Sequence, residues 1–226
     1  MGLKIDRRAV IITKTLGVIV LVVLLAIMAK IVIWENDYYH NKGAEERAPE
    51  QAVITNIADA VNPNENEISE DKYNNYRVGY TEPRYLEIPR LAIKARVLSS
   101  EVNEHTLPNP DNIFDVSWYS GSGRPGENGN ILISGISEGS TKHGVFANLD
   151  SLEKNNEIIL ERGDGEKYTY VVQEISIVDK NNAASKLPMA QKRIDDKETL
   201  ALVTTRRSNE SSTQFNSIVI VKATKK

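Results

Sequence analysis

The sequence contains no cysteine, and only three histidines and two tryptophans occur among its 226 residues. Without cysteine the chain can form no disulfide bond, so its stability must come from a hydrophobic core. The same absence removes every cysteine nucleophile. The histidines are His40, His105 and His143, and their wide separation gives no metal-site spacing. We therefore expect neither a metal ion nor another cofactor.

A strong excess of positive charge is also missing, since the formal net charge is −3. Residues 1–34 carry five basic side chains and one acidic one, residues 35–82 carry four and eleven, and residues 83–226 carry nineteen of each. No folded part is strongly basic, so the chain lacks the electrostatic footprint of a nucleic-acid-binding protein. We expect no nucleic-acid partner.

Near the N-terminus, Leu16–Ala29 is a stretch of fourteen residues without a charge, and its apolar flanks extend it to residues 9–34. A membrane span needs roughly 20 mostly apolar residues. The basic head, residues 1–8, predicts a short cytoplasmic tail, with the rest of the chain outside. A cleaved signal peptide and a buried core helix are the alternatives. Ile27 fits a cleavage site poorly, and Leu16–Ala29 has no polar face. We therefore expect an uncleaved transmembrane signal anchor at residues 9–34.

Residues 35–82 are acidic and rich in Asn and Glu, which is typical of a spacer. Within them, residues 49–61 place apolar side chains at helical spacing, which fits either a short helix packed on the domain or local helicity in the spacer. We favour local helicity in the spacer. Residues 83–226 instead show about eight short β runs separated by turns, among them a hairpin signal at Gly163-Asp164-Gly165. This pattern predicts a mainly all-β domain, a closed or nearly closed barrel with short helices.

Several segments of this domain are similar to those of the sortase family, the membrane-anchored cysteine transpeptidases of bacterial surfaces. Their order and spacing carry the resemblance rather than any one of them. The resemblance implies an eight-stranded β-barrel and, as a partner, an extended sorting-signal-like peptide or a surface protein. The segments are IPRLAIKARV (88–97), PGENGNILISG (125–135), GVFANLDSL (144–152), TLALVTT (199–205) and SIVIVKA (217–223).

The resemblance also implies three catalytic positions, and all three are substituted. The family carries His after the glycine that here is Gly135, Cys at the end of TLxLVTC, and Arg in the last strand. This chain has Ile136, Thr205 and Ile218 there, or Ser217 for the last if the register shifts by one. Isoleucine neither exchanges a proton nor donates a hydrogen bond, and an unassisted hydroxyl ionises far less readily than a thiol. We expect the chain to be catalytically inactive.

Other residues near these positions offer substitute chemistry. His143, Arg206 and Arg207 are the candidates for a residual active site around Thr205, although each also fits a solvated loop residue. Ser137 lies in a G-x-S-x-G pattern, yet no histidine follows far enough downstream for a hydrolase triad. Three acidic residues, Glu138, Asp195 and Asp196, fit a Ca²⁺ site or an ordinary surface. Leu187–Ala190 contains a Leu-Pro pair, which we interpret as coincidence.

Two functions follow from these observations. We favour a catalytically degenerate, single-pass plasma-membrane protein whose extracellular domain is a peptide-binding, protein-binding or scaffold module in surface-protein or pilus display. The alternative is an active transpeptidase or hydrolase that uses Thr205 with unconventional helpers. A third possibility is a purely structural surface domain whose groove is filled by Ile136 and Ile218. Fold alone does not decide among them, because function belongs to the site.

Overall fold

The computed structural model describes residues 28, 30, 54, 56–59, 62–103, 105–185, 197–207 and 215–226. The chain divides into two units, Met1–Pro49 and Glu50–Lys226, and the second contains all the described strands. The predicted cytoplasmic tail and membrane anchor lie outside the described residues, apart from Met28 and Lys30, which are helical. Within the described part of the chain, no helix is both long and apolar enough to cross a bilayer.

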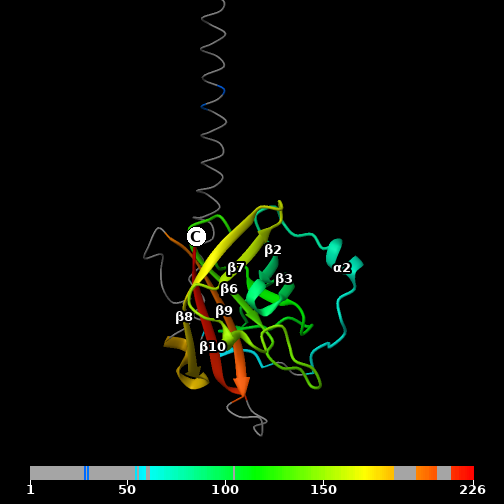
Figure 1. The fold of residues 1–226 in the computed structure, drawn as a ribbon, viewed down its shortest axis with the longest axis vertical. Helices are drawn as coiled ribbons and strands as arrows, with labels where there is room; N and C mark the ends of the chain where they lie inside the picture. The colour runs from blue at the N-terminus through cyan, green and yellow to red at the C-terminus, as the bar shows by residue number, and fades with distance from the viewer. Residues whose placement is uncertain are drawn as a thin grey trace, which may run out of the picture. The chain divides into compact units, whose positions relative to one another are not determined.

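Eight strands form a closed barrel in the order β10-β8-β7-β2-β3-β5-β6-β9 (Figure 1). This confirms the predicted eight-stranded, mainly β fold. Most neighbours are antiparallel, whereas β3 with β5 and β6 with β9 run parallel. The barrel strands are β2 (Pro83–Ile88), β3 (Ile93–Ser100), β5 (Val116–Tyr119), β6 (Gly129–Gly135), β7 (Glu157–Arg162), β8 (Lys167–Asp179), β9 (Glu198–Arg207) and β10 (Phe215–Lys225).

The predicted hairpin at Gly163–Gly165 joins β7 to β8, and Gly165 adopts a positive φ of 88° there. A positive φ is strained for residues with a Cβ, so glycine suits this turn. The remaining elements are short and connect or cover the strands. They are α2 (Glu70–Asn74), the two-residue strands β1 (Asn56–Ile57) and β4 (Thr106–Leu107), and the 3₁₀ helices η1 (Pro89–Leu91), η2 (Leu149–Ser151) and η3 (Lys180–Ser185).

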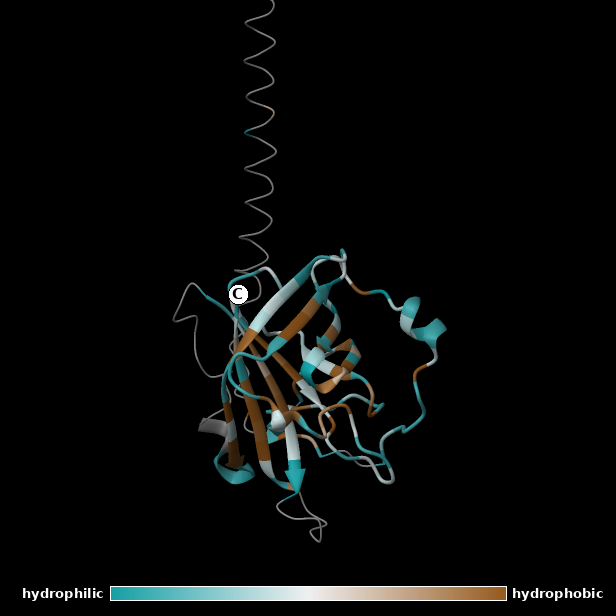
Figure 2. Ribbon diagram, viewed as in Figure 1, coloured by the Kyte–Doolittle hydropathy of each residue, from teal (hydrophilic) through white to brown (hydrophobic). Residues whose placement is uncertain are grey.

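The barrel interior holds the larger of two hydrophobic clusters, which includes Trp118, Phe146 and Tyr170. On β9, Leu200 and Leu202 point into this cluster because side chains two apart share a face. Strand β9 is nevertheless buried along most of its length and β10 over the run Ile218–Val221, and Figure 2 shows β10 as a nearly continuous apolar band. Such runs occur where a sheet is covered on both faces. Something therefore covers the outer face of these strands.

The cover consists of the second hydrophobic cluster, which lies on the outer face of β6, β9 and β10. Ile54 and Ile57 contribute to it from the N-terminal side, and Leu107 contributes from β4. Strand β1 pairs in parallel with β4, joining Asn56 to Thr106 and Ile57 to Leu107. The structure thus differs from the predicted spacer with local helicity. Ile54 and Ile57 are both buried, and Ile57 lies in strand β1, because burial on the barrel outweighs a weak helical pattern.

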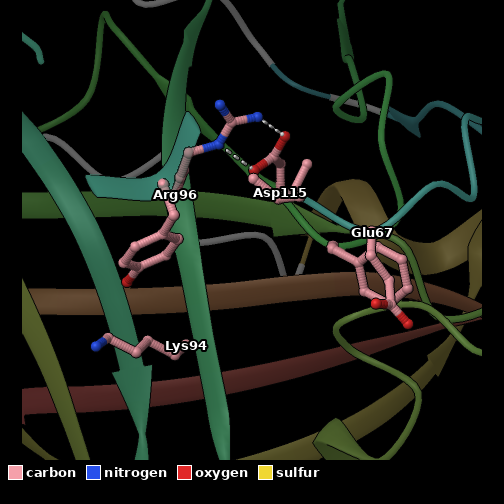
Figure 3. Close-up of a pocket in the computed structure, with 7 residues that line it drawn as sticks. Glu67, Lys94, Arg96 and Asp115 are labelled. Atoms are coloured by element: carbon pink, nitrogen blue, oxygen red, sulfur yellow. Dashed lines mark hydrogen bonds and ion pairs between the residues drawn. The ribbon is translucent and has the colours of Figure 1, made fainter. Parts of the chain in front are cut away.

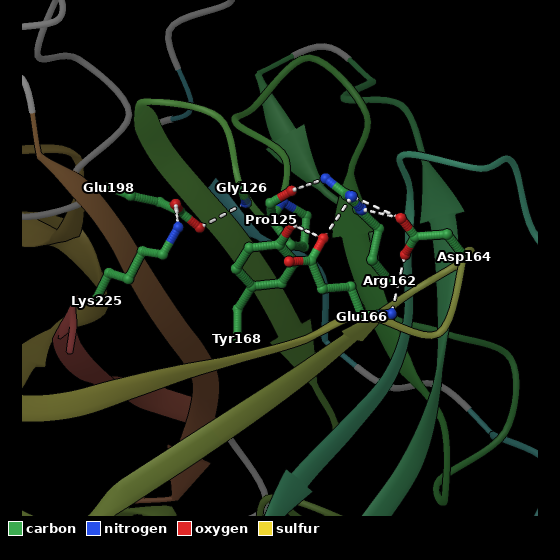
Figure 4. A network of polar contacts seen from close by, with 8 residues as sticks. All are labelled: Pro125, Gly126, Arg162, Asp164, Glu166, Tyr168, Glu198 and Lys225. Carbon is green, nitrogen blue, oxygen red and sulfur yellow. Dashed lines mark hydrogen bonds and ion pairs between the residues drawn. The ribbon is translucent and has the colours of Figure 1, made fainter.

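The start of β9 lies in a polar network (Figure 4). The buried Glu198 carboxylate accepts hydrogen bonds from the Tyr170 hydroxyl and, at 2.9 Å, from the Gly126 amide, and it pairs with Lys225 at 2.8 Å. Burial, and secondarily the Glu198 hydrogen bond, raise the pKa of Tyr170, which keeps this hydroxyl a donor. Every polar group named here has a partner, so the network fixes the C-terminal strand to the loop before β6.

Candidate functional site

The last two strands bring together two of the three substituted positions. Thr205 on β9 and Ile218 on β10 are direct partners in the antiparallel ladder, so their side chains lie on the same face of the sheet. Ser217 pairs instead with Arg206 and lies on the opposite face. The alternative register of the predicted site would therefore separate its third residue from Thr205. Ile218 is completely buried, and Thr205 is 3% exposed.

The third position, Ile136, follows the end of β6. Strand β6 runs parallel to β9 with Ser134 opposite Val203, and continuing that register by two residues leads from Ile136 to Thr205. The next residue confirms the proximity, because the Ser137 hydroxyl donates a 2.6 Å hydrogen bond to the Thr205 carbonyl oxygen. Ile136 is itself buried. The structure thus places all three positions at one end of the same sheet face.

Close backbone packing holds the turn after Ile136. Its carbonyl oxygen accepts a 3.0 Å hydrogen bond from the Phe146 amide, and the Ser137 carbonyl accepts one of 2.8 Å from the Gly144 amide. A Cβ on Gly144 would lie 2.2 Å from the Ile136 carbonyl oxygen, which explains glycine at this position. The serine of the G-x-S-x-G pattern is therefore part of a structural turn, and its hydroxyl is engaged with backbone.

The candidate helper residues are held by other partners. His143 is exposed, and it bridges to Glu138 in a small antiparallel turn. Arg206 forms an ion pair with Asp150. No hydrogen bond or ion pair joins Thr205 to His143, Arg206 or Arg207, all four of which are described. The structure does not assemble the residual active site that sequence reasoning offered around Thr205.

Arg207 lies close to the end of β9 but is engaged on two sides. Its guanidinium pairs with Glu138 at 3.1 Å and stacks over the Phe215 ring at 4.9 Å from the ring centre. An arginine held in this way is positioned between a carboxylate and an aromatic face, both of which stabilise its charge. Its contacts tie the loop after β6 to the adjoining ends of β9 and β10, so its described role is structural.

The outer face that carries these positions is covered by the chain itself. We call residues 54, 56–59 and 62–66 the N-terminal segment. Ile54 and Ile57 of this segment share a hydrophobic cluster with Ile218, Val203 and Leu132. The backbone that follows this contact is also bonded, since the Ala58 amide donates to the Leu107 carbonyl at 3.0 Å and the Asn64 amide donates to the Asp111 carbonyl at 2.8 Å. Apolar contact and backbone pairing together close this face.

Glu65 fastens the far end of the N-terminal segment to the loop after Ile136. Its carboxylate accepts hydrogen bonds from the backbone amides of Ser140 and Thr141 and from the Thr141 hydroxyl. Lys142 Nζ donates in return to the Glu65 carbonyl oxygen at 3.1 Å. These hydrogen bonds, first that of the Thr141 hydroxyl and then that of its amide, lower the pKa of Glu65. The carboxylate therefore stays ionised and holds the loop.

A separate cavity of about 260 Å³ lies between the loop before α2 and strand β3 (Figure 3). None of the three substituted positions lines it. Arg96 and Asp115 face one another in it through two hydrogen bonds of 2.7 and 2.9 Å and neutralise each other. Lys94 and Glu67 add one charge of each sign to the lining. The cavity therefore has no net charge that would favour an anion or a cation.

Metal binding has little support in the described part of the chain. No group of three or more His, Asp or Glu residues there is arranged to hold a metal ion. Glu138, one of the three acids considered for Ca²⁺, pairs with Arg207. The other two, Asp195 and Asp196, lie outside the described residues, as does the Leu-Pro pair within Leu187–Ala190.

Sequence reasoning singled out Ile136, Thr205 and Ile218 but did not predict the cover over Ile218. Ile54 and Ile57 looked like two apolar residues in an acidic spacer, and Glu65 looked like one acid among eleven. Their partners are distant in the sequence, with Glu65 bonding residues 75 and 76 positions away. The one available signal was the mismatch between a polar spacer and the apolar pair Val53-Ile54 with Ile57.

The family model of the sortase domain matches residues 86–226, which is more than half of the chain. No curated protein matches the sequence.

Three solved structures share the fold at a TM-score of 0.50 each. The chain is similar to a lid mutant of sortase A from Corynebacterium diphtheriae at 18% identity, covering 69% of this chain and 76% of that one. It is similar to sortase C from Streptococcus pneumoniae at 18% identity, covering 78% and 84%. It is similar to sortase C-1 from Actinomyces oris at 16% identity, covering 81% and 98%. By its domain and its barrel, the chain belongs to the sortase family.

Proposed function

We propose that this chain is a non-catalytic sortase homologue that is anchored in the bacterial plasma membrane and acts outside the cell as a binding or scaffold module. In this role it would support the display of surface proteins or pili rather than join them covalently. The proposal adds to family membership a statement about the site, because the fold alone is compatible with either activity or its loss.

One observation carries the proposal. The positions that the family resemblance assigns to catalysis hold Ile136, Thr205 and Ile218, all of which are buried. Ile218 packs in one hydrophobic cluster with Ile54 and Ile57 of the N-terminal segment. Acyl transfer needs a nucleophile, a proton donor and a group that stabilises the oxyanion. Two isoleucines supply neither of the last two functions. The cover also replaces the water and the substrate that an active site must admit.

The membrane location rests on the sequence. A stretch of fourteen uncharged residues, Leu16–Ala29, follows a basic head and precedes an acidic segment. This order places the N-terminus in the cytoplasm and the barrel outside. A membrane-tethered barrel without turnover remains able to concentrate a partner protein near the membrane, which is the physical basis of a scaffold.

Mass spectrometry of the intact chain tests the loss of catalysis. The full-length protein would be incubated with a panel of Leu-Pro-containing sorting peptides, and free peptide would be followed in the same samples. We expect neither an acyl adduct nor cleaved peptide from the wild type or from Thr205→Ala. An adduct that disappears in Thr205→Ala would instead establish the alternative, a threonine transpeptidase or hydrolase.

Complementation tests the scaffold role separately. Cells that lack this chain would be given the wild type, Thr205→Ala or no gene, and the amount of surface-displayed protein would be measured. Equal rescue by the wild type and Thr205→Ala, with loss of display in its absence, is the expected result. Rescue by the wild type alone would show that the Thr205 hydroxyl performs chemistry. A triple variant, Ile136→His/Thr205→Cys/Ile218→Arg, would show whether the face still accepts a sorting peptide once it carries the family's groups.

A further inference from the structure

Strand β8 is longer than the partner strand on one of its two sides. Strand β7 pairs with it only from Lys167 to Val171, and the Asn155–Asn156 turn then takes both backbone groups of Val172 at 2.9 Å. Strand β10 pairs with the other side as far as Asp179. Within the described ranges, no backbone hydrogen bond occupies the β7 side of residues 174–179. This half of β8 ends at the left margin of the barrel in Figure 1.

The residues of this edge suit pairing with another strand. An edge is normally blunted by proline, lysine or a bulge within it, and residues 174–179 contain neither proline nor lysine. The one irregularity is a bulge at its start, opposite Lys222 and Ala223. Ile177 is 53% exposed, which makes it one of few large apolar side chains that the described residues leave in solvent. Lys222 lies 3.5 Å from Glu174 and partly neutralises the edge.

The sequence of the edge, Gln173 to Asp179 (QEISIVD), is close to self-complementary about Ser176. In an antiparallel pair centred there, Ile175 of each copy opposes Ile177 of the other, and Ser176 opposes itself. Glu174 then opposes Val178, and Gln173 opposes Asp179, so no two like charges face one another directly. Ile175 and Ile177 share one face of the strand, because they are two residues apart.

We propose that the edge of β8 at residues 174–179, which no described strand occupies on the β7 side, binds the same edge of a second copy of this chain. The two strands pair antiparallel about Ser176, which joins the two barrels into one continuous sheet across a two-fold axis. Such an interface is isologous, so each copy supplies the same residues. It goes beyond the proposed function and does not depend on the loss of catalysis, although a scaffold with two copies would present two partner sites together.

The absence of cysteine gives this proposal a direct test. The full-length chain in detergent would carry a single cysteine, as Ser176→Cys or, in the matched control, as Gln173→Cys. At the two-fold axis the paired Cβ atoms are about 4.5–5.5 Å apart, within reach of a short bismaleimide crosslinker. The two Gln173 positions would be six residues apart along the strand, about 20 Å. We expect covalent dimer from Ser176→Cys at about tenfold or more the yield from Gln173→Cys.

A second pair of variants identifies the surface. Adding Ile177→Lys to Ser176→Cys places two charges beside the axis, so the crosslinked dimer should fall about tenfold. Adding Tyr80→Lys, which alters another exposed apolar side chain, should leave the yield unchanged. Circular dichroism would confirm that each variant is folded. Equal crosslinking by the two cysteine variants, absence of crosslinked dimer, or a yield unaffected by Ile177→Lys would each overturn the proposal.

Discussion

The two ends of strand β9 differ in whether they bury a charged group. At its start, Glu198 is a buried carboxylate whose partners include a lysine, a hydroxyl and a backbone amide. Near its other end, Thr205 is buried, and Ile218 opposite it is fully buried. At the start of β9 a buried charge is thus paired where it fixes the barrel. At the other end, the buried pair of Thr205 and Ile218 carries no charge.

The two ends of β9 are therefore stabilised in different ways. A buried charge is tolerated only when it is paired and hydrogen-bonded, and the network around Glu198 meets that condition. At the other end, Ile218 makes hydrophobic contact with the N-terminal segment. Burial of apolar surface stabilises a fold without any requirement for solvent access.

The largest expected effect is at the polar end. Glu198→Ala would leave the Tyr170 hydroxyl, the Gly126 amide and Lys225 without their shared acceptor. The unpaired buried hydroxyl costs about 1–3 kcal/mol, and with the space left by the removed side chain we expect a total of about 3–5 kcal/mol. Urea unfolding would measure the change in free energy of unfolding. Glu157→Gln, which removes only the exposed pair with Lys226, should change it by less than about 1 kcal/mol. Equal effects of the two variants would show that the network is not a stabilising unit.

The second-largest effect is expected under the N-terminal segment, which covers the outer face of β9 and β10. Ile57 is completely buried between β4 and the outer face of the barrel, so Ile57→Ala should cost about 2–5 kcal/mol in free energy of unfolding. The matched control is Tyr80→Ala, at a side chain that is 73% exposed, and it should fall within about 0.5 kcal/mol of the wild type. If Ile57→Ala were as neutral as the control, the segment would be only a tether.

A smaller effect is expected at the turn after Ile136, where the Ser137 hydroxyl contacts the end of β9. Ser137→Ala removes the hydrogen bond to the Thr205 carbonyl oxygen and should lower the free energy of unfolding by about 0.5–1.5 kcal/mol. Thermal and urea unfolding would measure it. Because this hydroxyl is a structural donor, Ser137→Ala should also leave any esterase or peptidase background unchanged. A drop in such activity would instead indicate that Ser137 acts as a nucleophile.

The smallest effect is expected from the exposed hydrogen bonds that the Glu65 carboxylate accepts from Ser140 and Thr141. Its pKa is lowered in the folded chain, so its contribution is complete above the ordinary value of about 4.3 and is lost as the pH falls through the lower folded value. Amide hydrogen exchange at Ser140 and Thr141 should therefore lose protection, after correction for intrinsic rates, only in strongly acidic solution. Glu65→Gln should lose part of this protection already at neutral pH. An acid step that persists in Glu65→Gln would have to arise from another group.

Much of the barrel was predictable because its signals are local. Alternating apolar residues and the Gly163–Gly165 turn indicate strands and a hairpin without knowledge of the rest of the chain. The family resemblance placed Thr205 and Ile218 in the last two strands, and the ladder pairs them directly. That resemblance also directed attention to Ile136, which the Ser137 hydrogen bond brings to the same place.

The cover was not predictable by the same reasoning. Strand β1 has two residues and acquires its conformation from β4, about fifty positions later in the chain. A two-residue strand has no period of its own, so the helical spacing around it was the stronger local pattern. The carboxylate of Glu65 likewise gains its role from a loop that follows β6. Non-local partners decide both features, and composition does not reveal them.

Accessibility of the Thr205 position tests the central claim, that the sortase face of this chain is closed. In a protein without other cysteines, Thr205→Cys would report on that face alone, and Ser99→Cys would report on an exposed site. Because a buried thiol reacts only through local opening, we expect alkylation of Thr205→Cys to be at least about a hundredfold slower than that of Ser99→Cys. Comparable rates would show an open face, and they would contradict the account.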